Sequence, residues 1–177
     1  LFSQSVAFAI MLVITGFSVA LALLYDRQEL AIIALVGGFL APFMVSDNSG
    51  NFRSLFTYLI ILNAGLLVFA YYKAWRLLNL LAFIFTIILF SGWIISLPST
   101  TTRSTYSAGF IFATIFYALF FVINIAHNIR EQKKFIASDF GILLANTALY
   151  YSAGMYFLSQ MQAASYQGLF CILMALL

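Results

Sequence analysis

Charged side chains are the scarcest class in this sequence. Only 7% of the 177 residues are Asp, Glu, Lys or Arg, whereas a soluble domain carries about 25%. Hydrophobic residues make up 64% of the chain, and the mean hydropathy is +1.06. They are grouped in long runs, and a bilayer-spanning helix needs roughly 20 such residues. The composition predicts an integral membrane protein of the all-α class, a polytopic bundle of transmembrane helices.

Cysteine and histidine are almost absent as well. Cys171 and His127 are the single residues of their kinds, which excludes an intrachain disulfide and a His/Cys metal cluster within this chain. No Ser/His/Asp, Cys/His or HExxH arrangement can be drawn, and no glycine-rich phosphate loop follows a strand. We therefore predict no catalytic, cofactor-binding or metal-binding residues, and we expect a protein that is not an enzyme.

The apolar runs predict six full spans and a truncated seventh, over residues of about 6–24, 30–46, 54–72, 77–97, 107–126, 135–158 and 169–177. They form one predicted transmembrane domain over residues 1–177. Leu1 is not an initiator Met, and the chain stops partway through the last run. We expect an internal piece of a longer multi-pass protein.

Basic residues are unevenly divided among the predicted loops. The segments near 25–29, 73–76 and 127–134 hold Arg27, Lys73, Arg76, Arg130, Lys133 and Lys134, whereas the other loops hold Arg53 and Arg103. Cytoplasmic loops are enriched in Lys and Arg, so these three segments are predicted to be cytoplasmic. The basic residues lie between apolar runs, and we expect no binding to nucleic acid.

The second span contains Gly37, Gly38 and Pro42 and is shorter than a bilayer requires. Proline removes a backbone donor and disfavours helical dihedrals in the residue before it, so we predict a kinked or broken helix. A re-entrant segment is the other arrangement. The favoured interpretation is structural, and the alternative is a discontinuous helix of the kind that transporters use to bind ions or substrates.

Polar residues inside predicted spans are candidates for a polar path: Asn63, Asp139, Asn146 and Tyr150. Asp139, Asn146 and Tyr150 share one helical face. The favoured alternatives are amide hydrogen bonds between helices and, for Asp139 or Ser138, a cap at the start of the sixth span. Ala137, Gly141 and Ala145 recur every four residues, a pattern that favours close helix packing.

Several stretches resemble a known family. They are LALLYD at 21–26, ALVGGFLAPF at 34–43, Gly50-Asn51, LFTYL at 55–59 and WRLLNLLAF at 75–83. Together they are similar to the bacterial predicted membrane proteins grouped as domain of unknown function 2339. The likeness is concentrated in residues 20–90, and Ala41 stands where the family often has Thr. The resemblance implies a long multi-pass protein of the bacterial inner membrane, and it implies no substrate, cofactor or catalytic residue.

Two functions follow as hypotheses. The first is a non-enzymatic structural or scaffolding component of a bacterial envelope assembly, with membrane lipids and other membrane subunits, or the rest of its own chain, as partners. The second is a transporter or lipid-handling protein that uses the broken second helix. The two differ in whether the polar residues converge on a wet cavity near the midplane.

Overall fold

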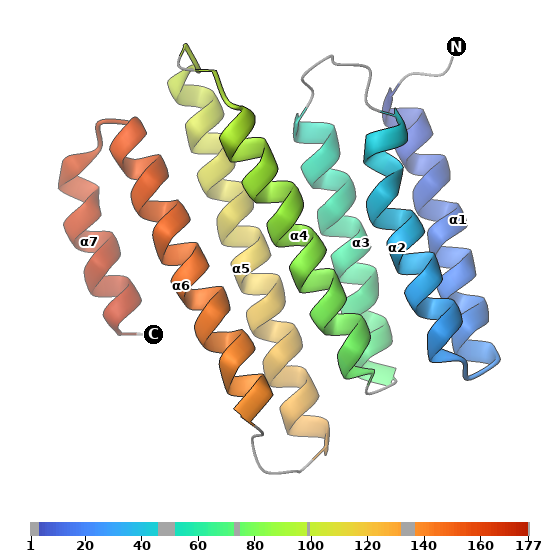
Figure 1. The fold of residues 1–177 in the computed structure, drawn as a ribbon. Helices are drawn as coiled ribbons and strands as arrows, with labels where there is room; N and C mark the ends of the chain where they lie inside the picture. The colour runs from blue at the N-terminus through green and yellow to red at the C-terminus, as the bar shows by residue number, and fades with distance from the viewer. Residues whose placement is uncertain (1–3, 46–51, 73–74, 99, 132–136, 177) are drawn as a thin grey trace. The chain divides into compact units, whose positions relative to one another are not determined.

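The chain is helical throughout the part that the structure describes. The structure is a computed structural model, and it describes residues 4–45, 52–72, 75–98, 100–131 and 137–176 (Figure 1). Within these residues there are seven α-helices and no strand. The helices are α1 (Gln4–Leu24), α2 (Gln28–Val45), α3 (Phe52–Tyr72), α4 (Arg76–Ser96), α5 (Arg103–Glu131), α6 (Ala137–Gln160) and α7 (Ala164–Ala175). The predicted all-α class is confirmed.

Each apolar run coincides with one helix, but α5 is longer than predicted. It covers 29 residues, so His127, Asn128 and Arg130 belong to a helix and not to a loop. No proline or glycine follows the apolar run there, and polar side chains such as Arg and Glu favour helix. At 1.5 Å per residue α5 is about 43 Å long, so it exceeds the hydrocarbon thickness of about 30 Å. Residues 46–51, which join the second and third predicted spans, lie outside the described residues.

Of the six predicted full spans, three are supported by the length and composition of the described residues. Three helical segments are long and apolar enough to cross a membrane: Val6–Leu24, Leu77–Ser96 and Arg103–Ile125. Within the described residues, α2, α3 and α7 contribute the shorter apolar segments Gln28–Phe43, Phe52–Leu66 and Ser165–Ala175. α6 has the length of a span, but Asn146, Thr147 and Ser152 lower its hydropathy.

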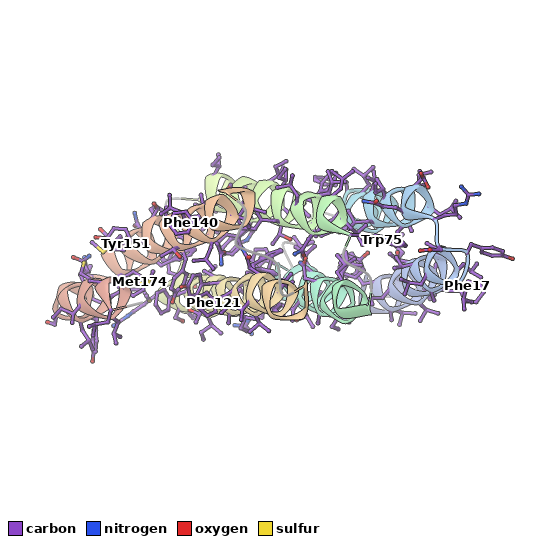
Figure 2. The ribbon with its side chains drawn as sticks, turned by 90° about the horizontal axis from the view of Figure 1, so that it is seen from below. Phe17, Trp75, Phe121, Phe140, Tyr151 and Met174 are labelled. Atoms are coloured by element: carbon purple, nitrogen blue, oxygen red, sulfur yellow. The ribbon has the colours of Figure 1, made fainter. Side chains whose placement is uncertain are left out.

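The chain divides into two compact units, Leu1–Ile95 and Ser96–Leu177. In the first unit α1 packs against α2 and α3, and α2 also contacts α3. Seen from below, α1 and α3 form one layer of this unit, and α2 and α4 form the other (Figure 2). In the second unit α6 packs against both α5 and α7. The single transmembrane domain stays a prediction.

Aromatic rings attach α4 to the rest of the first unit. Phe85 of α4 stacks on Phe39 of α2 with ring centroids 5.4 Å apart. Nearer the C-terminal end of the helix, Trp93 contacts Phe56 at 4.9 Å and Phe52 at 5.1 Å. Such ring pairs stabilise a contact by about 0.5–1.5 kcal/mol beyond the area that they bury. α4 is thus joined to α2 and α3 through large side chains.

The outward faces of the helices are apolar. Val13 is 71% exposed, Ile33 69%, Phe17 66% and Leu144 62%. Phe17 on α1 and Phe140 on α6 point away from the neighbouring helices (Figure 2). A water-soluble domain seldom exposes so much contiguous apolar surface, whereas lipid tails solvate it well. These faces suit a hydrocarbon environment.

Candidate functional site

The second helix is continuous, so the predicted break at Gly37, Gly38 and Pro42 is not present as a gap in the helix. α2 runs from Gln28 to Val45 with Pro42 inside it. Pro42 lies in the last turn, where few further backbone bonds depend on it. Proline cannot donate the hydrogen bond that residue 42 of a regular helix gives to the carbonyl of residue 38. The local cost of Pro42 is therefore one unpaired acceptor, the Gly38 carbonyl.

A tyrosine of the next helix supplies the missing donor. The Tyr58 hydroxyl of α3 donates a hydrogen bond to the Gly38 carbonyl oxygen at 2.6 Å, and both residues are buried. Thr15 of α1, also buried, lies within hydrogen-bonding reach of the same hydroxyl. We call Thr15, Gly38, Pro42 and Tyr58 the three-helix junction. Its backbone irregularity is satisfied from inside the bundle, as the membrane interior requires.

The two adjacent glycines of α2 have different surroundings. A Cβ atom built on Gly38 would lie 2.8 Å from Thr15 Cγ2 and 3.2 Å from Thr15 Oγ1. A Cβ on Gly37 would meet nothing within 4 Å, and Gly37 is exposed. Gly38 therefore permits the close approach of α1 and α2, whereas Gly37 does not contribute to that contact.

Asn63 connects α3 to α4 and is fully buried. Its Nδ2 donates to the Leu59 carbonyl at 2.9 Å and to Thr86 Oγ1 at 3.0 Å, while the Thr86 hydroxyl donates to the Ala82 carbonyl at 2.8 Å. Asn63 Oδ1 is buried and has no hydrogen-bond partner among the described residues. The Asn63 side chain therefore bridges α3 and α4 through its Nδ2 group alone.

Asn146 and Tyr150 of α6 both face α5. Asn146 Nδ2 donates to the Tyr117 carbonyl at 3.2 Å, and the Tyr150 ring stacks on the Tyr117 ring with centroids 4.5 Å apart. The Tyr150 hydroxyl lies 3.0 Å from Thr114 Oγ1, which itself donates to the Phe110 carbonyl. The predicted common face of Asn146 and Tyr150 is thus occupied by contacts with the neighbouring helix.

The predicted polar path has two further members, Asn63 and Asp139. Asn63 belongs to the first unit, and the side chain of Asp139 lies outside the described residues. Of the small-residue stripe, Gly141 is exposed and a Cβ there would meet nothing within 4 Å. Ala145 is half-buried, and the side chain of Ala137 is not described. The polar path and the packing role of the stripe stay predictions.

A different glycine makes the tight contact in the second unit. Phe170 of α7 lies so close to Gly154 of α6 that a Cβ there would stand 2.6 Å from Phe170 Cε1 and nearer still to Cζ. The same ring also contacts Tyr150, Tyr151 and Phe110. Phe170 is thus the aromatic side chain through which α7 docks on α6, and Cys171 adds a second contact, with its Sγ 3.4 Å from the Tyr151 hydroxyl. The described residues include no group of three His, Cys, Asp or Glu side chains able to hold a metal ion.

One comparison with known proteins gives a match. The profile of a family described as a predicted membrane protein, DUF2339, covers residues 1–177. The chain belongs to the DUF2339 family. No curated protein and no solved structure matches it. The resemblance predicted from residues 20–90 is confirmed, and the family profile extends beyond them to residues 1–177.

Sequence reasoning missed the partners that complete each contact of this DUF2339 protein. Tyr58 and Thr15 were not singled out, although a proline inside an apolar run points to an unpaired carbonyl four residues earlier. A hydroxyl in the middle of a neighbouring run is the natural donor for such a carbonyl. Gly154 and Phe170 carried no comparable signal, because nothing in the sequence indicates which ring will face which glycine.

Proposed function

We propose that this DUF2339 protein is a non-enzymatic membrane component whose helices serve a structural or scaffolding role in a bacterial envelope assembly. The observation that supports this role is the Tyr58 hydrogen bond to the Gly38 carbonyl. An ion or substrate site at a helix break needs free backbone carbonyls around a cavity. Here the one carbonyl that Pro42 frees is bonded, and Thr15 packs beside it.

The alternative is a transporter or lipid-handling protein. The feature that favours it is the buried Asn63 Oδ1, which has no partner among the described residues. The two functions predict different environments for the three-helix junction. It is dry in a scaffold and wet along a transport path.

Cysteine accessibility separates these two possibilities. A thiol reacts with a charged, membrane-impermeant reagent only where water and the reagent can reach it. In a Cys171→Ser background, we expect the Thr15→Cys variant of the full-length protein to be unreactive in membranes opened to the reagent from both sides. The Tyr25→Cys variant, at an exposed turn, is the positive control. Labelling of the Thr15→Cys variant at the control rate would contradict the scaffolding proposal and favour transport.

We further propose that another membrane helix, from a partner subunit or from the rest of the chain, packs along Ala137, Gly141 and Ala145. The exposure of Gly141 supports this contact. A Gly141→Leu variant should then lose membrane subunits that copurify with the wild-type protein. Gly92→Leu is the matched control, because Gly92 is also exposed and has nothing within 4 Å of its Cβ position. Equal copurification with both variants would contradict a partner on this stripe.

The proposed location is the bacterial inner membrane, with the segments near 25–29, 73–76 and 127–134 in the cytoplasm. The spanning lengths of α1, α4 and α5 support this arrangement. The segments near 25–29 and 73–76 lie on the same side of the membrane if α2 and α3 both cross it, or if neither does. α4 then crosses away from that side, and α5 returns to it, so the basic segments stay together as the positive-inside rule requires.

A further inference from the structure

The side-chain amide of Asn63 is a buried polar group of the first unit that is only partly satisfied by the described residues. The residue is 0% exposed and lies in the middle of α3. Both hydrogens of Nδ2 are used, one on the Leu59 carbonyl and one on Thr86 Oγ1. Oδ1 is buried without a hydrogen-bond partner among the described residues. A buried amide oxygen in that state requires an explanation.

The orientation of the amide is fixed by its surroundings. If the oxygen and nitrogen were exchanged, Oδ1 would face the Leu59 carbonyl, and two acceptors would oppose each other. The nearby hydroxyls are also committed. Thr86 donates to the Ala82 carbonyl, and Tyr58 donates to the Gly38 carbonyl. If Tyr58 turned away, the Gly38 carbonyl would be left unpaired, because Pro42 has no N–H to donate to it.

The way in which α4 packs favours a small hydrogen-bond donor beside Asn63 Oδ1. The closely packed helix pairs of the unit are α1 with α2 and α3, and α2 with α3, whereas α4 is joined through stacked rings such as Phe39 and Phe85. Asn79 is two turns before Thr86 on the same side of α4, and its Oδ1 is likewise buried without a partner among the described residues. Two amide oxygens on one helix seam therefore lack donors.

We propose that the seam between α3 and α4 is a binding site for internal water, with one water molecule donating a hydrogen bond to Asn63 Oδ1. Water is small enough to enter a fully buried site, and it supplies donors where the protein supplies acceptors. Buried waters in proteins bridge polar groups that the chain leaves unpaired. A single bound water does not open a path for a charged thiol reagent, so this site is compatible with a dry three-helix junction.

Water-edited solid-state NMR of the full-length protein in lipid bilayers tests the site. The experiment transfers magnetisation from water to asparagine side chains, and the Asn63→Leu variant assigns the Asn63 signal by its loss. We expect the Asn63 side chain to receive magnetisation at least several times faster than core leucines such as Leu35 and Leu59, which are also 0% exposed. Transfer at the rate of those leucines would overturn the proposal.

A high-resolution structure of the full-length protein in lipid provides the second test. We expect density for a water molecule within hydrogen-bonding distance of Asn63 Oδ1, both in the wild type and in a Thr86→Val variant, because that change leaves the oxygen unpaired. A side-chain or backbone donor on Oδ1, or contact with apolar atoms alone, would show that no water is bound there.

Discussion

At the scale of single residues, the sequence places two glycines side by side, and the structure gives them opposite roles. Gly38 is buried against Thr15, and Gly37 is exposed. The GG pair could be recognised in the sequence as a place where helices approach each other. Which of the two glycines makes the approach depends on the rotation of α2 about its axis, and the nearly uniform hydrophobicity of that helix does not specify this rotation.

We expect Gly38→Ala to destabilise the protein by about 1–3 kcal/mol, because the added methyl group meets the short, branched side chain of Thr15, which has little freedom to move. Gly37→Ala is the matched control and should be neutral or slightly stabilising, since alanine favours helix and has open space there. The measurement is the free energy of unfolding in mixed lipid and detergent. Equal effects of the two substitutions would contradict the assigned packing.

The polar residues show the same division between what a sequence predicts and what packing decides. Asn63, Asn146 and Tyr150 were identifiable as polar residues inside apolar runs, and two of them share a face as predicted. Their partners were not identifiable, because a hydrogen bond such as that between Asn63 and Thr86 joins residues 23 positions apart. Such partners follow from how two helices are aligned, which composition does not fix.

At the scale of elements, helix positions were largely predictable and helix ends were less so. Pro98 marks the end of α4, which stops at Ser96 as its run suggests. α5 continues to Glu131 because no proline or glycine interrupts it after the apolar run, and Arg130 and Glu131 favour helix. The apolar run defines the part of a helix that lies in the membrane, and the helix itself extends into the polar flank.

The contact between α6 and α7 gives a prediction at this scale. Gly154→Ala places a methyl group inside the volume of the Phe170 ring, so α7 must shift. Hydrogen exchange of α7 amides should then increase by about 5- to 150-fold, for a loss of about 1–3 kcal/mol. A second substitution, Phe170→Leu, should restore much of the protection by making room. Gly141→Ala is the control and should leave α7 exchange unchanged. Unchanged α7 exchange in Gly154→Ala would contradict the assigned docking.

At the scale of the whole molecule, the family and the membrane environment were accessible from sequence, and three of the six expected spans are supported in the described residues. Apolar composition and the stretch ALVGGFLAPF led to the DUF2339 family, whose profile covers residues 1–177. Six runs of suitable length were expected to span, and three helices qualify in the described residues. Length and hydropathy must both be met, and the polar residues of α6 lower its hydropathy.

The proposed sidedness predicts an asymmetric labelling pattern. In intact cells with a Cys171→Ser background, a small maleimide that does not cross the inner membrane should label a Thr100→Cys variant, because this residue lies between α4 and α5. It should label a Tyr25→Cys variant only after the cells are broken. Both positions are exposed, so accessibility within the fold does not differ. The reverse pattern would invert the topology, and equal labelling in intact cells would place both turns outside.

The central claim is that Tyr58 compensates for the hydrogen bond that Pro42 removes, and a double-mutant cycle tests it most directly. Tyr58→Phe should cost about 1–2 kcal/mol of unfolding free energy in the wild type, because it leaves the buried Gly38 carbonyl unpaired. In a Pro42→Ala background the alanine N–H can bond that carbonyl, so the cost should fall by about 1 kcal/mol. The same cost in both backgrounds would show that the tyrosine does not substitute for the missing backbone donor.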